Sequence, residues 1–573
     1  MRFCPDTKMM PMKPFAAAVL SAIVTAFACL PAPAIADTGE VVRVFDVPRS
    51  ELASLRYLGD FWSVDWRDDA AVMLVTPAGR RALESAGYRV ETDHARDAER
   101  LAFLNIDRAA WRERGLGGIP GYPCYRTVTE TYADLSALAA DNPGLARWES
   151  IGQSWEAGQA GMDGDDIFVL VLANQAVDHV QAPLLVMGAQ HSRELVSAEV
   201  AARFAEHLLN GYASDPVARW LLDHREIHIV AQQNPDGRRR VEGDQTVWRK
   251  NTNDSGCGAA SYGVDLNRNS SFLYGNASSS NCGSQIYRGS SAASEPETQA
   301  IQDYMEEIFE RQRPVTGPGT DLHTPAPADT QGIFLSLHSF GEMVLLPWEG
   351  LGGQNENNAP NHDELTILGR KLGHYTDYAV ARWDLLGPAG GTTVDYAYGE
   401  FGVAAYTLEL GTSFLQDCAT FEATIWPDTL AALLFAAKAT ERPYQAPWGP
   451  EIPLLSVSRD PDSGQFLIEG TANSGGYYRG GVSEPPADDP VFPVAAVIAS
   501  LDLPPHLADQ TYSLDITQTG PVASFSGAIS VAPQEITQRL VFVQATDSEG
   551  HVGVATPAWL VIDHLFEDRF EQP

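Results

Sequence analysis

Short apolar segments alternate with longer amphipathic segments over residues 125–442, and this alternation limits the possible folds more than any other feature of the chain. Residues 167–172 and 183–188 are typical of buried strands, because apolar side chains run through them with few interruptions. Residues 198–209 and 295–309 carry apolar side chains at helical spacing instead. Strands and helices that alternate in this way predict an α/β fold, with helices on both faces of a central sheet.

The pattern differs on either side of this central region. Residues 41–95 predict a small α/β unit of short strands and two short helices, followed by a polar stretch and a Gly/Pro-rich linker at 115–122. After residue 443, short alternating segments lie among Gly, Pro and Asp turns, as in a β-sandwich. The expected divisions are a signal peptide at 1–36, the small α/β unit with its linker at 37–120, a catalytic domain at 121–442, a β-sandwich at 443–565 and a tail at 566–573.

The N-terminus has the features of an export signal. Lys8 and Lys13 precede an apolar run at 15–30, and Ala34-Ile35-Ala36 matches an A-x-A cleavage signal. The run is too short and too weakly flanked for a good membrane span. The alternative to a signal peptide is a buried N-terminal helix. We expect a secreted protein, extracellular or periplasmic, that keeps no membrane attachment once the signal is cleaved.

Composition argues against two classes of function. The formal net charge is −36, whereas a nucleic-acid-binding protein needs clustered Lys and Arg to displace counterions. The same charge suits solubility outside the cell. No Cys-x-x-Cys pair occurs, which argues against a zinc site built from cysteines.

The cysteine count predicts disulfides. Of the six cysteines, Cys4 and Cys29 would leave with the signal peptide, and an even number remains after cleavage: Cys124, Cys257, Cys282 and Cys418. An even count in an exported chain favours disulfide bonds, and four cysteines allow three pairings. We favour Cys257–Cys282, which closes a short Gly/Ser-rich loop, and therefore Cys124–Cys418.

Two histidines and a glutamate follow apolar strands and can share a metal ion. His191 and Glu194 come directly after the strand at 183–188, where α/β folds place their ligand loops. Three-residue spacing in a tight turn directs both side chains to one point, and an imidazole with a carboxylate suits Zn²⁺. His338 ends the apolar run at 333–337 and supplies a third ligand. Each feature alone occurs more often in purely structural roles, so the interpretation depends on their combination.

Taken in order, these motifs resemble the zinc site of the carboxypeptidase A and carboxypeptidase T family. The matching segments, all between residues 125 and 442, are His191-Ser192-Arg193-Glu194, Asn234-Pro235-Asp236-Gly237, Trp248-Arg249-Lys250, Asp265-Leu266-Asn267-Arg268-Asn269, His338-Ser339-Phe340, Val394-Asp395-Tyr396-Ala397-Tyr398 and Tyr406-Thr407-Leu408-Glu409-Leu410. The resemblance implies a carboxypeptidase-like α/β/α sandwich with a mixed central sheet. It also implies a zinc-dependent enzyme that hydrolyses the C-terminal peptide bond of peptides and proteins.

The resemblance assigns chemistry to five side chains. His191, Glu194 and His338 are the expected ligands of one Zn²⁺, which would activate a water molecule. Glu409 is the expected general base and the later proton donor to the leaving amine. Arg249 is expected to stabilise the oxyanion.

The resemblance also assigns substrate contacts. Asn267 and Arg268 are the expected clamp for the terminal carboxylate, and Arg193 is a secondary contact. Val394 is expected to line the pocket for the terminal side chain. In the family an acidic residue at this position accompanies a basic-residue preference, so valine predicts apolar or aromatic terminal residues. Glu349 aligns near the same pocket and opposes that expectation.

Two features of the chain qualify the resemblance. The family usually has a mobile tyrosine where this chain has Gly387, which predicts weaker substrate binding. Residues 37–120 resemble a propeptide, which would cover the active site until an activating protease cuts the linker; the alternative is a permanently attached accessory domain.

Two other functions remain open from the sequence. A related zinc hydrolase acting on cell-wall peptides or N-acyl amino acids would use the same clamp for a terminal carboxylate. A binding module with a vestigial site is the other alternative, and the intact His191, Glu194, His338 and Glu409 argue against it.

Overall fold

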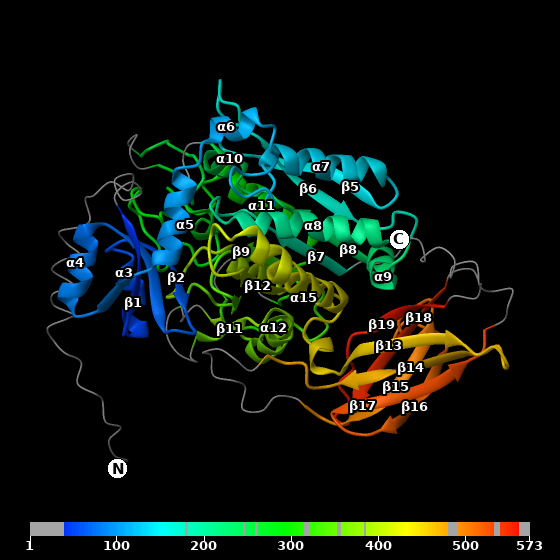
Figure 1. Ribbon diagram of the computed structural model, residues 1–573. Helices are drawn as coiled ribbons and strands as arrows, with labels where there is room; N and C mark the ends of the chain where they lie inside the picture. Colours follow the sequence, from blue (N-terminus) through cyan, green and yellow to red (C-terminus); the bar gives the residue numbers. More distant parts are fainter. Residues whose placement is uncertain are drawn as a thin grey trace, which may run out of the picture.

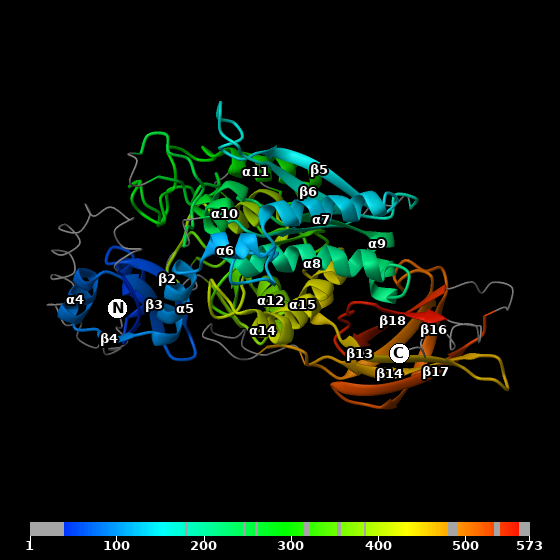
Figure 2. The ribbon, with the colours of Figure 1, turned by 45° about the horizontal axis from the view of Figure 1, so that its top comes forward.

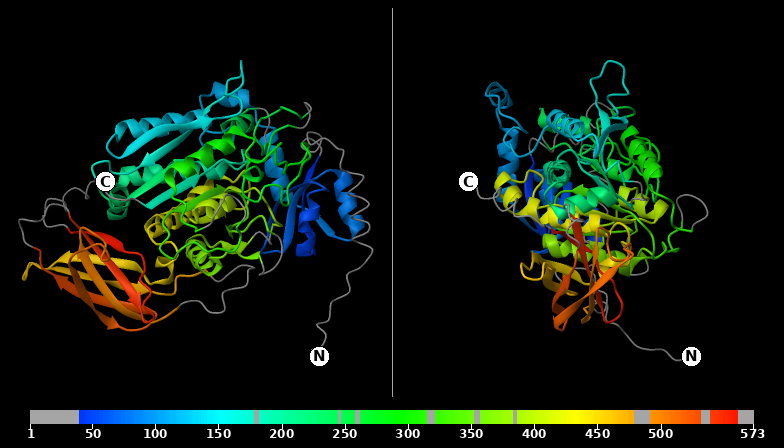
Figure 3. Two further views of the ribbon diagram at one scale, coloured as in Figure 1. Left: turned by 180° about the vertical axis from the view of Figure 1, so that it is seen from behind. Right: turned by 90° about the vertical axis from the view of Figure 1, so that its right-hand side faces the viewer.

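Three β-sheets make up the framework of the protein. The computed structural model describes residues 39–177, 182–243, 247–257, 262–314, 321–351, 357–382, 386–478, 491–531 and 539–560. Figures 1 and 3 show the N-terminal and C-terminal sheets at opposite ends of the central sheet. The expected signal peptide at 1–36 and tail at 566–573 lie outside the described residues, and the domain boundaries stay a prediction.

The central sheet is mixed and has eight strands in the order β11-β10-β12-β9-β7-β8-β6-β5. β7 is parallel to β8 and β9, β9 is parallel to β12 and β10 to β11, whereas β10–β12, β6–β8 and β5–β6 are antiparallel. The strands are β5 (Ala146–Gln153), β6 (Asp166–Leu172), β7 (Ala182–Met187), β8 (Arg225–Val230), β9 (Ile333–His338), β10 (Met343–Leu346), β11 (Ala379–Arg382) and β12 (Ala404–Glu409). This sheet confirms the expected fold class.

Helices pack against the central sheet. α7 contacts α8, α8 contacts α15, and α15 contacts α12. α7, α8 and α12 also contact strands of the sheet, whereas α11 contacts β5 and α13 contacts β9 and β12. Their bounds are α7 (Val128–Asp141), α8 (Leu195–Gly211), α9 (Pro216–His224), α10 (Pro235–Glu242), η2 (Leu266–Arg268), α11 (Pro296–Ile308), α12 (His362–Thr376), α13 (Thr393–Tyr396), η5 (Ala397–Phe401), α14 (Cys418–Thr420), η6 (Phe421–Ile425), α15 (Trp426–Ala439) and η7 (Ala446–Trp448). β9 and β12 are buried along their whole length, which explains their apolar sequences.

The N-terminal unit is a four-stranded antiparallel sheet in the order β2-β3-β1-β4. Its elements are β1 (Glu40–Phe45), η1 (Arg49–Glu51), α3 (Leu52–Leu55), β2 (Asp60–Asp65), β3 (Ala70–Val75), α4 (Pro77–Ala86), β4 (Arg89–Thr92), α5 (His94–Leu104) and α6 (Arg108–Glu113). Its core is continuous with Met343 and Leu345 of β10, so the unit packs directly against the central region. Figure 2 shows β2 and α5 on the side that faces that region.

The C-terminal sheet has seven antiparallel strands in the order β13-β14-β17-β16-β15-β18-β19. The strands are β13 (Glu451–Arg459), β14 (Phe466–Asn473), β15 (Val494–Leu501), β16 (Thr511–Gln518), β17 (Val522–Ile529), β18 (Arg539–Asp547) and β19 (Thr556–Leu560). β13 also contacts β18 and β19, so the two ends of the sheet approach each other around one core, as in a β-sandwich.

Buried contacts join this sandwich to the central region. Lys371 on α12 is fully buried, and its Nζ lies 2.7 Å from Glu451 Oε1 on β13. The Trp220 ring on α9 packs edge-on against Phe542 on β18, with ring centroids 5.5 Å apart. Because Phe542 belongs to the central hydrophobic core, the sandwich is an integral part of the packing rather than a tethered module.

Two disulfides have the pairing that the sequence favoured. Cys257–Cys282 closes a loop of the central region, and Cys124–Cys418 joins the segment before α7 to the start of α14. Among the described residues, no helix has both the length and the apolar character needed to cross a bilayer.

The pair between Lys371 and Glu451 predicts a stability effect. Replacing Glu451 with Gln leaves the buried Lys371 ammonium without its carboxylate, so we expect a loss of about 3 kcal/mol. Thermal unfolding and limited proteolysis of the sandwich measure the effect. Glu549→Gln, at an exposed position of the same sandwich, is the control, and equal stability of the two variants would contradict the prediction.

Candidate metal and active site

Parallel strands of the central sheet bring the candidate residues to one edge. β9 pairs in parallel with both β7 and β12, so the carboxyl ends of these strands lie together. His191 and Glu194 follow β7, His338 is the last residue of β9, and Glu409 is the last residue of β12. Glu409 lies directly opposite His338 in the strand register.

The turn between β7 and α8 is tightly held. A Cβ at Gly188 would lie 2.6 Å from the Ser197 carbonyl oxygen, so only glycine permits this approach of the helix. Ala189 then adopts φ 54°, a left-handed conformation that is uncommon for a residue with a side chain. The Ala189 amide donates to Ser197 Oγ at 3.0 Å, and that hydroxyl donates to the Glu194 carbonyl at 2.9 Å. These bonds fix Glu194 at the N-terminus of α8.

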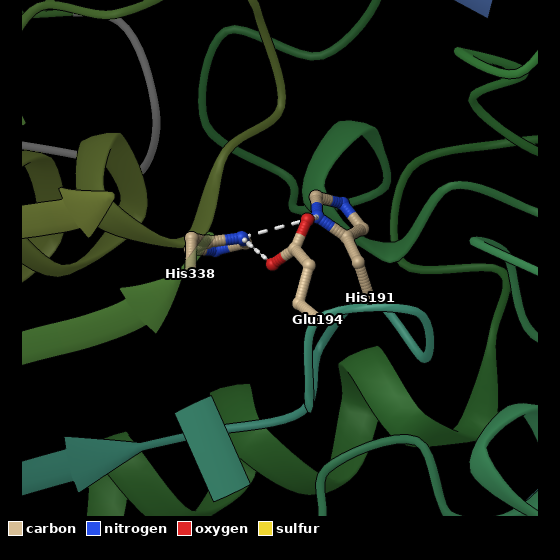
Figure 4. A group of neighbouring side chains, drawn as sticks. All are labelled: His191, Glu194 and His338. Carbon is tan, nitrogen blue, oxygen red and sulfur yellow. Dashed lines mark hydrogen bonds and ion pairs between the residues drawn. The ribbon is translucent and has the colours of Figure 1, made fainter. Parts of the chain in front are cut away.

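The three candidate metal ligands converge on one point. His191 Nδ1 lies 2.8 Å from Glu194 Oε1, and His338 Nδ1 lies 2.9 Å from Glu194 Oε2. The two Nδ1 atoms are 3.0 Å apart. Figure 4 shows both imidazole rings and the carboxylate pointing toward one another, and all three side chains are buried. The ligand atoms therefore come close enough to share one ion.

The opposite ring nitrogens show which tautomers are present. His191 Nε2 donates to Asp265 Oδ1 at 3.0 Å, and His338 Nε2 donates to Gln190 Oε1 at 3.1 Å. In a neutral ring this arrangement leaves Nδ1 without a proton, so its lone pair faces Glu194, as second-shell acceptors impose at metal sites. Two lone pairs and a carboxylate that face one another fit a shared cation, and two histidines with one carboxylate are a donor set of catalytic zinc.

A buried carboxylate organises the cationic side of the site. Asp265 Oδ2 accepts from Arg249 Nη2 at 3.0 Å and lies 4.0 Å from Arg268 Nη1. Burial opposes ionisation of Asp265, but Arg249, Arg268 and His191 hold its pKa well below the usual value. Arg249 Nη1 lies 3.2 Å from His191 Nδ1 and 3.8 Å from Glu194 Oε1. The Arg249 guanidinium thus lies beside the candidate metal ligands.

The backbone beside Arg249 is held in place by a neighbouring loop. Lys250 Nζ donates to the Cys282 carbonyl oxygen at 2.9 Å, and Cys282 is joined by its disulfide to Cys257 on the same segment as Lys250. The Arg249 carbonyl oxygen in turn accepts from the Ser192 amide at 3.2 Å. The disulfide therefore supports the segment that presents Arg249 to the site.

The expected substrate-binding residues divide into two places. Asn267 Oδ1 accepts from the Thr393 amide at 3.1 Å, which places Asn267, Arg268 and the neighbouring Val394 together. Arg193 lies elsewhere, buried beneath the N-terminal unit, where its Nη1 is 2.6 Å from Asp60 Oδ2. Its guanidinium also stacks on Phe414, 4.1 Å from the ring centroid.

Glu409 is buried at the end of β12. Burial raises its pKa to about 8; His338 and Arg249 oppose this shift, and Glu194 and Glu349 add to it. A cation held by His191, Glu194 and His338 would favour the ionised form. A carboxyl group whose pKa is raised by burial and lowered by nearby cations can accept and return a proton near neutral pH.

Residues 386–391, the described part of the loop at Gly387, include no aromatic side chain that could close over a substrate. Gly387 has φ 77°, so a side chain there would strain the backbone. The adjacent carbonyl oxygens of Leu386 and Pro388 accept from Arg56 of the N-terminal unit, at 2.8 and 3.3 Å. Burial, with the nearby Arg268 and Arg249, lowers the pKa of Arg56 to about 9. Tyr396 and Tyr398, which follow Gly387 in the sequence, are packed in the core.

Sequence reasoning did not assign roles to four residues that the structure adds to this region. Gln190 and Asp265 orient the two histidines, and Asp60 and Arg56 reach the site from the N-terminal unit. Asp265 and Gln190 stand beside recognised motif residues, so their position in the chain was a usable signal. No local pattern marks Asp60 or Arg56, because their contacts lie more than 100 residues away.

The orienting role of Asp265 predicts an effect on metal affinity. Asp265→Asn removes the charged acceptor of His191, so we expect zinc affinity to fall about 10- to 100-fold. Competition with a chromophoric chelator measures the change. His207→Gln, a half-exposed histidine on α8, is the control; an Asp265→Asn protein that binds zinc like this control would contradict the prediction.

Comparisons with known proteins agree with this geometry. The family model described as zinc carboxypeptidase matches residues 131–427, just over half of the 573-residue chain. A zinc carboxypeptidase of Saccharothrix mutabilis subsp. capreolus is 32% identical over 214 residues, which cover 36% of this chain and 46% of the relative. Human carboxypeptidase A1 is 27% identical over 432 residues, which cover 72% of this chain and 93% of the relative. The chain thus spans less than half of the first relative and nearly all of the second.

Solved structures show the same fold. Carboxypeptidase A from Helicoverpa armigera matches with a TM-score of 0.57 and 24% identity, over 71% of this chain and 98% of its own. Thrombin-activatable fibrinolysis inhibitor matches with a TM-score of 0.53 and 19% identity, over 70% of this chain and 98% of its own. At such identities the likeness concerns the fold, which in both cases extends beyond the central sheet of this chain.

Proposed function

The chain belongs to the zinc carboxypeptidase family, and from this premise we propose that it removes single residues from the C-terminal ends of peptides and proteins. The observation that carries the proposal is the convergence of His191, Glu194 and His338, with Glu409 opposite His338 in the strand register. The clamp residues at 267–268 lie on the same network through Asp265. The proposed zinc site, the Arg249 cation, the Glu409 base and the carboxylate clamp would then lie together at one edge of the sheet.

Each residue has a chemical task in the proposal. Bound zinc supplies a Lewis acid that polarises the scissile carbonyl and makes water nucleophilic near neutral pH. Glu409 takes the proton from the attacking water and later gives it to the leaving amine. Arg249 faces the developing oxyanion, where a fixed cation contributes several kcal/mol. Asp265 supports this task by holding Arg249 and by fixing the tautomer of His191.

The clamp explains why the enzyme would act at chain ends. The Arg268 guanidinium can bind a terminal carboxylate through two parallel hydrogen bonds, and Asn267 can donate a third. A peptide bond within a chain offers no such anion. An N-acyl amino acid or a cell-wall peptide with a free carboxylate would fit the same clamp, which keeps such substrates as the second candidate. A panel of capped and uncapped substrates separates the two functions.

We propose that the protein acts outside the cell. The export signal at 1–36 and the two disulfides support secretion, since disulfides persist in oxidising compartments. The expected terminal-residue preference, apolar or aromatic, rests on Val394 alone, and the pocket around it contains further groups that bear on this preference.

The role of Glu409 predicts a large kinetic effect with no loss of metal. Glu409→Gln keeps the shape of the side chain but cannot accept the proton, so we expect kcat to fall about 10²- to 10⁴-fold. Zinc content should stay at the wild-type level. The buried Glu400, which pairs with Arg311 on another side of the fold, provides the control variant Glu400→Gln. Wild-type turnover in Glu409→Gln would refute the proposed mechanism.

The N-terminal unit supports a proposal of autoinhibition. Its Asp60 occupies Arg193, the expected secondary carboxylate contact, and Arg56 binds the carbonyl groups on either side of Gly387. Asp60 and Arg193 are both buried, so Arg193 is not accessible to a substrate while the N-terminal unit stays docked. Cleavage in the linker at 115–122, by an activating protease, would release the unit.

This arrangement predicts a difference between intact and cleaved protein. Asp60→Ala leaves the buried Arg193 without its carboxylate and weakens docking, so we expect the intact variant to hydrolyse peptides faster than the intact wild type. Asp65 lies on the same strand as Asp60 and forms a half-exposed ion pair with Arg43. Asp65→Asn removes that pair and should change the hydrolysis rate little. Hydrolysis assays before and after linker cleavage measure the effect. Equal rates of intact and cleaved wild type would rule out autoinhibition.

A further inference from the structure

A second buried carboxylate lies on the substrate side of the sheet. Glu349 follows β10, is fully buried, and its Oε1 accepts from Thr407 Oγ1 at 2.8 Å. Thr407 precedes Glu409 by two residues on β12, so both side chains point to the same face of the sheet. Two strand residues span about 7 Å. The Glu349 carboxylate is therefore about one strand repeat deeper in the protein than Glu409.

Glu349 also lies within electrostatic reach of the clamp. Burial lowers the pKa of Arg268, and the charges of Asp265, Glu349 and Glu409 oppose that shift. The Glu349 charge likewise contributes to the raised pKa of Glu409. A terminal residue whose carboxylate is held by Arg268, beside Glu409, would thus have its side chain near the Glu349 carboxyl group.

The backbone around Glu349 is fixed on both sides. The amides of Glu349 and Gly350 donate to the Asp395 carboxylate at 2.8 and 2.7 Å. The Glu349 carbonyl oxygen accepts from the Ala389 amide at 2.8 Å. Asp395 directly follows Val394, so these bonds tie Glu349 to the segment that carries Val394. The position of the Glu349 carboxylate is therefore set before a substrate arrives.

We propose that the terminal-residue pocket selects lysine and arginine, with Glu349 binding the ammonium or guanidinium group and Val394 packing against the methylene stem. The proposal rests on the carboxypeptidase function and specifies its substrate class. A lysine or arginine side chain can give the Glu349 carboxylate a charge-assisted hydrogen bond, which an apolar side chain cannot. An extended lysine or arginine side chain spans about the strand repeat that separates Glu409 from Glu349. Aliphatic walls suit such a side chain, because its stem is apolar. This proposal replaces the apolar preference expected from Val394 alone.

A competing role for Glu349 is to balance the charge of Arg268. In that case Glu349 would act through the clamp that every substrate uses. Removing Glu349 would then weaken the binding of every substrate equally, whatever its C-terminal residue. If Glu349 instead binds basic side chains, its removal weakens only substrates that end in lysine or arginine. The two roles therefore differ in selectivity rather than in overall rate.

The test compares acylated dipeptides that differ only in the last residue, Lys, Arg, Leu or Phe. The zinc-loaded full chain is used after cleavage in the linker at 115–122. We expect kcat/KM for Lys and Arg to exceed that for Leu and Phe, and Glu349→Gln to lower the first two by about 30-fold or more. For the dipeptides that end in Leu or Phe, kcat/KM should change less than about threefold. Glu297→Gln replaces another fully buried acid, on α11, and should alter none of the four.

Binding to Glu409→Gln, with and without Glu349→Gln, gives a readout that needs no turnover. Calorimetry should show tighter binding of the Lys and Arg dipeptides, and loss of that difference with Glu349→Gln. An equal fall for all four dipeptides, or a wild-type preference for Leu and Phe, would overturn the proposal. If no dipeptide is hydrolysed but Lys and Arg still bind selectively through Glu349, the pocket assignment stands and the carboxypeptidase function fails.

Discussion

Parallel pairing of β9 with β7 and β12 aligns three strand ends at one edge of the central sheet, and the active site depends on that alignment. A ligand loop follows β7, a histidine ends β9 and a glutamate ends β12. These residues are up to 218 positions apart in the chain, yet the register fixes their separation. The turn at Gly188 and Ala189 then sets the direction of the first two ligands.

The site is a buried arrangement of opposing charges around this edge. Glu194 and Asp265 face His191 from its two ring nitrogens, and Arg249 bridges the same two carboxylates. Buried charges are tolerated only where partners compensate the loss of water. Each charged group therefore constrains its neighbours, so Arg249 and the candidate metal ligand His191 are held in fixed positions together. The same principle applies at the N-terminal unit, where Asp60 compensates the buried charge of Arg193.

Much of this arrangement follows from the sequence, because its signals are local. Apolar runs predicted the strands of the central sheet, and the strand-end positions of His191 and His338 predicted the meeting of ligands. Helices α5 and α6 were missed, since residues 96–114 looked polar. Asp93 caps α5 through its Oδ1, and only Arg100 and Phe103 on that helix are buried. Because so few side chains of α5 are buried, its sequence shows only weak helical periodicity.

Contacts between distant segments were beyond local patterns. The approach of Arg56 to the Gly387 loop and the bond between Thr407 and Glu349 depend on how whole units pack. The terminal-residue pocket illustrates the consequence. In the sequence, Val394 indicates an apolar pocket and Glu349 opposes that expectation. The fold adds the bond from Thr407 to Glu349, which places this carboxylate beside the strand that ends in Glu409.

X-ray absorption at the zinc edge of the metal-loaded protein tests the central claim most directly. The account predicts one zinc per chain, bound by two imidazole nitrogens and carboxylate or water oxygens at about 2.0–2.2 Å. A spectrum with one imidazole or none, or with sulfur ligands, would show that His191, Glu194 and His338 do not share the ion.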